Sequence, residues 1–155
     1  MSMYQYSEIR QVLSFSKEIA CKIKNLAIEC EVYQPSNDDF LLYATDANYL
    51  VGFIIWREIL PEIELLSIAV KAEYRGQKIG QELLKIADRH WKKNADKVFL
   101  ELRESNLIAR NLYTKFDFQE IARRKNYYPA KQGKEAAIIM CREYHKHEEK
   151  RIYKG

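Results

Sequence analysis

Cysteine, proline and glycine are all scarce in this sequence. Its 155 residues include three cysteines, three prolines and five glycines. The cysteines, Cys21, Cys30 and Cys141, are odd in number, widely scattered and in no metal-ligand spacing. This arrangement indicates neither a disulfide scaffold nor a metal site, and it favours a reducing compartment such as the cytoplasm.

No proline-, glycine- or serine-rich linker and no internal repeat divides the chain. A chain of this length suits one domain and buries roughly 70% of its unfolded surface, which is enough for a real core. We therefore expect a single domain over residues 1–144. The mixed charges of residues 145–155 are typical of a flexible tail.

Long hydrophobic runs are also absent. The longest, residues 49–56 with one glycine, falls well short of the roughly 20 residues that a membrane-spanning helix needs. The first ten residues lack the charged start and apolar stretch of a signal peptide. We therefore expect a cytoplasmic protein with no membrane contact.

A large excess of one charge is missing as well. Lysine and arginine total 26 against 22 aspartates and glutamates, a formal net charge of +4. This mild basic excess suits a phosphate-bearing cofactor or a nucleoprotein partner. By itself it is too small to indicate nucleic-acid binding.

The most informative stretch that is present runs from Ile68 to Leu84. An apolar run gives way to a basic turn with glycines at residues 75–80, and helical periodicity follows. A helix that opens at such a turn directs unpaired backbone N–H groups and the positive end of its dipole toward the space in front. The stretch therefore predicts an anion site, with phosphate as the natural occupant.

Hydrophobic periodicity predicts the order of the remaining elements. We expect a helical region over residues 9–27 that could break near 14–16, strands at 40–45 and 49–59 joined by a hairpin turn, a strand at 63–70, a helix at 79–94, a strand at 98–102, a helix at 106–116, and strands at 118–124 and 136–141. This order predicts an α/β (α+β) fold. Its mixed, mostly antiparallel sheet would contain one central parallel strand pair, with helices on both faces.

Several short segments together resemble one protein superfamily. They are I-A-V at 68–70, the turn at 75–80, L-E-L-R at 100–103, S-N at 105–106, N-L-Y at 111–113, R-R-K-N-Y-Y-P at 123–129 and G-K-E-A-A-I-I-M at 133–140. The chain resembles a GNAT-fold N-acetyltransferase over roughly residues 40–142. Its carboxy-terminal half is similar to the ribosomal-protein alanine N-acetyltransferases of the RimI type.

The resemblance implies acetyl-CoA as co-substrate, no metal, and a sheet whose parallel strands splay at the cofactor site. It also implies transfer of the acetyl group to a primary amine, such as the N-terminal α-amino group of a ribosomal protein. A monomer or weak dimer would suffice, and no nucleic acid is required. The acceptor segment Pro-Trp-Ser that is usual in RimI-like enzymes is missing before residue 40. A small amine or a lysine side chain as acceptor, or a non-catalytic acyl-CoA-binding or ribosome-associated module, therefore stays open.

The resemblance assigns the cofactor site to two segments and two further residues. They are the turn residues Arg75, Gly76, Gln77, Lys78, Ile79 and Gly80, the strand residues Ile68, Ala69 and Val70, and the residues Asn106 and Tyr113. The amides from Gln77 to Gly80 would hold the pyrophosphate, while the strand backbone and Asn106 would bind the pantetheine arm. Lys78 stands where the superfamily usually has glycine, and Gly76 could supply some of the lost backbone freedom. Read alone, the turn could equally be a polar loop before an amphipathic helix.

Glu101 and Tyr113 are the candidate catalytic residues. Strand alternation sends Glu101 to the opposite face from Leu100 and Leu102, where its carboxylate could accept a proton from the incoming ammonium. An exposed ion pair with Arg103 or Lys97 is the alternative. Tyr113 could protonate the departing thiolate, because a phenol with a reference pKa near 10 matches a thiolate of similar basicity. The alternative for Tyr113 is packing between helix and sheet.

Tyr127 and Tyr128 are the candidate acceptor-binding residues. We expect them in a loop before Pro129, where the resemblance implies that they wall a narrow channel for the peptide. Packing of the two rings over the edge of the core is the alternative.

Overall fold

The computed structural model describes residues 3–145. These residues fall into two compact units. One contains the chain up to Ile59 together with Glu64–His90, and the other contains Leu60–Ile63 and the chain from Trp91 onward. The single domain over residues 1–144 stays a prediction. The predicted tail lies outside the described residues except for His145.

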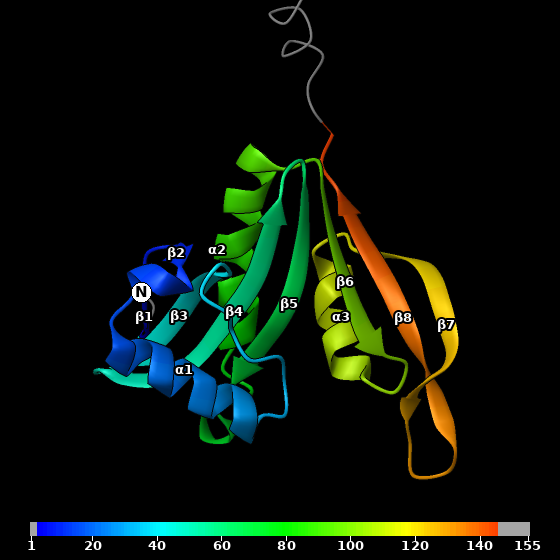
Figure 1. The fold of residues 1–155 in the computed structure, drawn as a ribbon, viewed down its shortest axis with the longest axis horizontal. Coiled ribbons are helices and arrows are strands. Elements are labelled where there is room, and N and C mark those ends of the chain that lie inside the picture. Colours follow the sequence, from blue (N-terminus) through cyan, green and yellow to red (C-terminus); the bar gives the residue numbers. More distant parts are fainter. Residues whose placement is uncertain (1–2, 146–155) are drawn as a thin grey trace, which may run out of the picture. The chain divides into compact units, whose positions relative to one another are not determined.

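The first unit holds most of the amino-terminal elements (Figure 1). They are β1 (Gln5–Tyr6), β2 (Arg10–Gln11), η1 (Val12–Ser14), α1 (Lys17–Glu29), β3 (Phe40–Asp46), β4 (Tyr49–Ile59), β5 (Glu62–Val70), η2 (Ala72–Tyr74) and α2 (Ile79–Asn94). Strand β5 begins and helix α2 ends in the second unit. The predicted helix at 79–94 and the strands at 40–45, 49–59 and 63–70 are confirmed to within one residue.

A tight hairpin joins β3 and β4. Its two turn residues, Ala47 and Asn48, have φ values of 44° and 80°, and Asp46 pairs with Tyr49. Positive φ at both central residues is the geometry that matches the twist of the flanking strands. The predicted hairpin is therefore confirmed.

Helix α1 buries one apolar stripe against the β3–β4 strands (Figure 1). The cluster comprises Val12, Ile23, Leu26, Ala27, Leu41, Phe53, Ile55 and Ala69, all buried. Ser16 begins the helix as its N-cap, accepting a hydrogen bond from the Ile19 N–H at 3.2 Å. This cap explains why the helix begins at Lys17 and not earlier.

The prediction of helix is wrong for residues 9–11, whereas residues 12–14 form the short 3-10 helix η1 and the expected break precedes α1. Arg10 and Gln11 form β2 and pair with β3, and the Val12 N–H donates to the Asp39 carbonyl at 2.8 Å. The backbone of this segment therefore satisfies its hydrogen bonds through distant residues. The spacing of Ile9, Val12 and Leu13 matches the period of a helix. Leu13 is nevertheless 68% exposed, so these residues do not form one buried helical face.

The second unit contains β6 (Lys97–Arg103), α3 (Leu107–Lys115), β7 (Gln119–Pro129) and β8 (Lys134–Glu143). Strand β8 lies between β6 and β7 and is antiparallel to both. The predicted strands at 98–102 and 136–141 and the helix at 106–116 are confirmed. Strand β7 runs five residues beyond the predicted end at Arg124, and every residue of it except Tyr128 is exposed.

Candidate active site

The turn between β5 and α2 leaves backbone donors free. The Glu82 N–H donates to the Lys78 carbonyl, which is the first helical bond of α2. Within the part of the chain that the structure describes, no carbonyl or side chain accepts from the N–H groups of residues 77–80. Unpaired amides at the start of a 16-residue helix favour an anion. This geometry is the one that the predicted pyrophosphate site requires.

Lys78 has a left-handed backbone conformation, which glycine adopts more readily than other residues. Its φ is 63°, and Gly76 also has a positive φ of 80°. A left-handed residue with a Cβ costs about 1–2 kcal/mol relative to an ordinary conformation. Lys78 is exposed, so its ammonium is accessible to a ligand at the turn.

Three side chains hold this turn in place. The Tyr4 hydroxyl donates to Gln77 Oε1, and its ring meets Tyr74 edge-on with centroids 6.1 Å apart. Tyr74 donates to Asp46 at 2.9 Å, which raises the pKa of Tyr74. Arg75 donates from Nε to the Val70 carbonyl at 3.1 Å. The guanidinium of Arg75 therefore binds the end of β5, and sequence reasoning gave no signal for Tyr4 or Tyr74.

Residues 68–70 form the last part of β5. Ala69 is buried, whereas Ile68 and Val70 are half-buried and face Gly80. A Cβ added at Gly80 would lie 3.7 Å from Val70, which is ordinary contact. A Cβ at Gly52 would lie only 3.0 Å from the Ala69 carbonyl oxygen. Glycine at position 52 therefore allows β4 to approach β5 closely.

Glu101 lies on β6 between two buried leucines, as strand alternation predicts. Leu100 and Leu102 are 4% and 6% exposed, whereas the Glu101 side chain is 33% exposed. Its Oε1 lies 3.9 Å from Arg124 Nε. Arg103, the alternative partner, instead donates to the Pro129 carbonyl at 2.8 Å. The ion pair of Glu101 is thus formed with a residue of β7.

Tyr127 and Tyr128 lie within β7, so the prediction that they occupy a loop is wrong. Their rings meet edge-on with centroids 4.9 Å apart. Burial raises the pKa of Tyr128, and the charge of Glu101 together with a hydrogen bond to it raises that pKa further. The two tyrosines therefore form one cluster with the candidate catalytic carboxylate. Their role in binding an acceptor stays a prediction.

Tyr113 is buried in helix α3, where its ring packs against Phe118 with centroids 5.6 Å apart. Burial raises the pKa of Tyr113 well above its usual value of about 10. Its phenol therefore keeps its proton throughout the physiological range, and the match to a thiolate expected from reference values is not retained. Packing and proton donation are both compatible with this position.

Asn106 is the N-cap of α3, and its Oδ1 accepts from the Ala109 N–H at 3.2 Å. The side-chain amide nitrogen is the group that could bind a pantetheine carbonyl. Binding of pantetheine by Asn106 stays a prediction.

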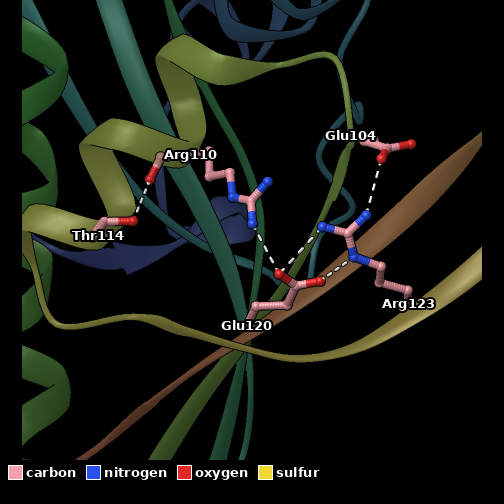
Figure 2. Close-up of polar contacts among 5 residues, drawn as sticks. All are labelled: Glu104, Arg110, Thr114, Glu120 and Arg123. Carbon is pink, nitrogen blue, oxygen red and sulfur yellow. Dashed lines mark hydrogen bonds and ion pairs between the residues drawn. The ribbon is translucent and has the colours of Figure 1, made fainter.

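A charged network ties the end of β6 to α3 and β7. Figure 2 shows Arg123 donating both to Glu120 and, at 2.9 Å, to Glu104. Arg110 of α3 donates to the same Glu120 at 2.8 Å. The hydrogen bond from Arg123 lowers the pKa of Glu120. This network fixes the connection that carries Asn106.

The model of the acetyltransferase (GNAT) family matches residues 6–118, which is most of the chain. The chain belongs to this family. The predicted superfamily is therefore confirmed.

Curated relatives include the [ribosomal protein bS18]-alanine N-acetyltransferases of Escherichia coli K12 and Haemophilus influenzae. They are 38% identical over 98 residues and 41% identical over 96 residues. The matches cover 63% and 61% of this chain, and 66% and 65% of the respective relatives. The chain thus spans slightly less than two thirds of the length of these GNAT relatives. The resemblance to the RimI-type branch is confirmed.

Solved structures show the same fold. The ribosomal-protein-S18-alanine N-acetyltransferase from Escherichia coli has a TM-score of 0.78 at 25% identity, covering 92% of this chain and 96% of that one. Ard1 from Thermoplasma volcanium has a TM-score of 0.73 at 22% identity, covering 94% and 100%. These similarities confirm the predicted GNAT fold class.

Within residues 3–145, none of the helices is long and apolar enough to cross a membrane. Among the same residues, no group of three or more histidine, cysteine, aspartate or glutamate side chains could hold a metal ion.

Proposed function

We propose that this GNAT chain is an acetyl-CoA-dependent N-acetyltransferase whose acceptor is the N-terminal α-amino group of a protein, such as a ribosomal protein. The similarity to bS18-alanine N-acetyltransferases supports the acceptor. The free amides of residues 77–80 support the co-substrate. We place the reaction in the cytoplasm.

The turn binds the phosphates of acetyl-CoA in this proposal. The amides of residues 77–80 would donate to the pyrophosphate, and the positive end of the α2 dipole would add to the attraction. The Lys78 ammonium would lie near the same phosphates. Backbone groups of residues 68–70 would bind the pantetheine arm, and one of their N–H groups would stabilise the oxyanion that forms during transfer.

Glu101 and Tyr113 move the protons. Glu101 accepts a proton from the acceptor ammonium, directly or through one water, and the free amine then attacks the thioester carbonyl carbon. A C–N bond forms and the C–S bond breaks. The phenol of Tyr113 gives its proton to the departing thiolate, and the second proton lost by the acceptor nitrogen restores the phenol. The products are an N-acetyl peptide and coenzyme A.

An α-amino acceptor suits a carboxylate that is one third exposed. The α-amino group has a reference pKa near 8, against about 10.4 for lysine. At neutral pH, a far larger fraction of an N-terminal acceptor is therefore already free amine. Glu101 then has to remove a proton from a smaller fraction of the acceptor molecules.

Incubation with acetyl-CoA tests the proposal. Purified protein receives a peptide that begins with alanine, the same peptide with a blocked N-terminus and an internal lysine, or a panel of small amines. Free thiol release and product mass are measured. We expect one acetyl group on the alanine peptide and none on the blocked peptide. Acetylation of the blocked peptide or of a small amine instead would assign a different acceptor, and no thiol release from any acceptor would exclude the activity.

A further inference from the structure

The pairing of β7 with β8 is interrupted between Arg124 and Tyr128. Arg124 pairs with Ala137 of β8, and Tyr128 pairs with Glu135. Four steps along β7 therefore match two steps along β8, so residues 125–127 include two extra residues. Extra residues on one strand of an antiparallel pair form a bulge, which bends that strand and redirects its side chains.

Asn126 lies at the centre of this bulge with a φ of 54°. Most residues with a Cβ avoid this left-handed region, and asparagine and aspartate tolerate it best after glycine. The side chain of Asn126 is exposed and, among the described residues, has no hydrogen bond or ion pair. Its contribution therefore comes from its backbone conformation.

The bulge brings two consecutive rings together. In a regular strand, consecutive side chains point to opposite faces of the sheet. Here the rings of Tyr127 and Tyr128 are 4.9 Å apart at an angle of 85°. A guanidinium group also lies over each ring. The Arg124 guanidinium is 5.4 Å from the Tyr127 ring centroid, and the Arg103 guanidinium is 4.5 Å from the Tyr128 ring centroid.

The tyrosine pair is connected to the candidate base. Arg124, which lies over Tyr127, is 3.9 Å from Glu101 Oε1, and Arg103, which lies over Tyr128, is on the same strand as Glu101. Glu101 and Arg103 lie two residues apart on β6 and therefore face the same side of the sheet. A change in the path of β7 at the bulge would thus move both rings relative to the carboxylate.

We propose that Asn126 is a positioning residue for the acceptor. Its left-handed backbone holds the bulge of residues 125–127, and the bulge holds Tyr127 and Tyr128 together as a wall beside Glu101. The acceptor it serves is a peptide with a free α-amino group and a small first side chain. This inference rests on the proposed function, and it adds a residue that touches neither acetyl-CoA nor the reacting atoms.

Three substitutions at Asn126 separate its backbone role from its side chain. Asn126→Gly and Asn126→Asp keep access to the left-handed conformation, whereas Asn126→Ala disfavours it. For Asn126→Ala we expect the KM for the alanine-initiated peptide to rise about fivefold to thirtyfold, as a penalty of this kind implies. The KM for acetyl-CoA should stay within twofold of the unaltered protein. Asn126→Gly and Asn126→Asp should restore most of the peptide KM.

Asp117→Ala is the matched control. Asp117 is also left-handed, with a φ of 64°, but it lies in the turn before β7 and pairs with Arg142 at 3.4 Å. It should lower the melting temperature as much as Asn126→Ala does and leave the peptide KM unchanged. An unchanged peptide KM in Asn126→Ala, or an equal loss in Asn126→Gly, would overturn the inference.

A readout without turnover keeps this inference separate from the proposed function. The near-ultraviolet circular dichroism of the tyrosines should change in Asn126→Ala and stay the same in Asn126→Gly and Asp117→Ala. If the unaltered protein acetylates no N-terminus, the proposed function fails while this spectral comparison still tests the bulge. Identical spectra for all variants would show that Asn126 does not hold the tyrosine pair.

Discussion

The turn at residues 75–80 and strand β7 each contain one left-handed residue that is not glycine, but the two are held differently. Lys78 sits in a turn braced by a hydroxyl from Tyr4, by the Tyr74 hydrogen bond to Asp46 and by Arg75 on the end of β5. Asn126 sits in an exposed bulge whose neighbours are rings stacked under guanidinium groups.

This difference suggests that one region is suited to binding a constant ligand and the other to selecting among acceptors. Directional hydrogen bonds fix a backbone closely, which suits phosphates that are the same in every reaction. Ring and guanidinium contacts on the surface are less directional and tolerate small shifts, which suits acceptors that vary. We therefore expect changes near the turn to affect acetyl-CoA or stability, and changes near β7 to affect the acceptor or the chemical step.

The largest expected effect separates chemistry from cofactor binding. Glu101→Gln removes the proton acceptor and keeps the shape of the side chain, so kcat should fall about 10²- to 10⁴-fold. The KM for acetyl-CoA should hardly change. Glu104→Gln, in the turn just after β6, is the control, because it loses only the surface ion pair with Arg123 and should cost at most about 1 kcal/mol of stability. Steady-state kinetics with both substrates varied check both variants.

Tyr113→Phe removes one hydroxyl and keeps the ring that packs on Phe118. We expect kcat to fall about tenfold to hundredfold, at the lower end of what general acids contribute, because a thiolate leaves easily. Burial raises the pKa of Tyr113, so its proton is retained as pH rises, and the unaltered protein should keep a level kcat up to about pH 10. A pH–rate profile of both proteins measures this. A loss of rate below pH 9 that Tyr113→Phe abolishes would contradict the assignment.

Gly52→Ala tests the close packing behind the cofactor turn. The new Cβ would lie 3.0 Å from the Ala69 carbonyl oxygen and 3.3 Å from the Ile79 side chain. We expect the free energy of unfolding to fall by about 1–3 kcal/mol, measured by urea denaturation. Gly80→Ala is the matched control, since its nearest neighbour would be 3.7 Å away. Equal losses in the two variants would show that packing at residue 52 has no special role.

The smallest expected effect concerns Lys78. Lys78→Gly removes the steric strain of a Cβ in the left-handed conformation, whereas Lys78→Ala keeps that strain. The free energy of unfolding should therefore be up to about 1 kcal/mol larger for the glycine variant than for the alanine variant. Both variants lose the ammonium, and both should bind acetyl-CoA a few-fold more weakly at low salt, with the difference vanishing at high salt. Calorimetric titration at two salt concentrations measures this. Equal affinity for all three proteins would remove Lys78 from the phosphate site.

Elements with a strong local pattern could be predicted from the sequence. The stripe of apolar residues in α2 located that helix to within a residue, and the alternation around Glu101 placed its carboxylate on the exposed side. The turn at residues 75–80 was recognisable because a helix start after a strand has the same local chemistry wherever it occurs.

Features set by distant residues could not be predicted. Arg10 and Gln11 form a strand because β3 offers an edge, and no local spacing reveals that edge. The segment with Tyr127 and Tyr128 before Pro129 reads as a loop, yet pairing with β8 and a bulge make it part of a strand. The contact of Tyr4 with Gln77 joins residues 73 positions apart, which spacing along one element cannot indicate.

The contact between Tyr4 and Gln77 links the amino-terminal segment to the turn at residues 75–80. Gln5 and Tyr6, next to Tyr4, pair with the edge of β3, where short strands open easily. A ligand that immobilises Gln77 would hold Tyr4 as well and slow deuterium uptake at these two amides, although it never touches them. Deuterium uptake at strand β1 should therefore show whether a ligand occupies the turn.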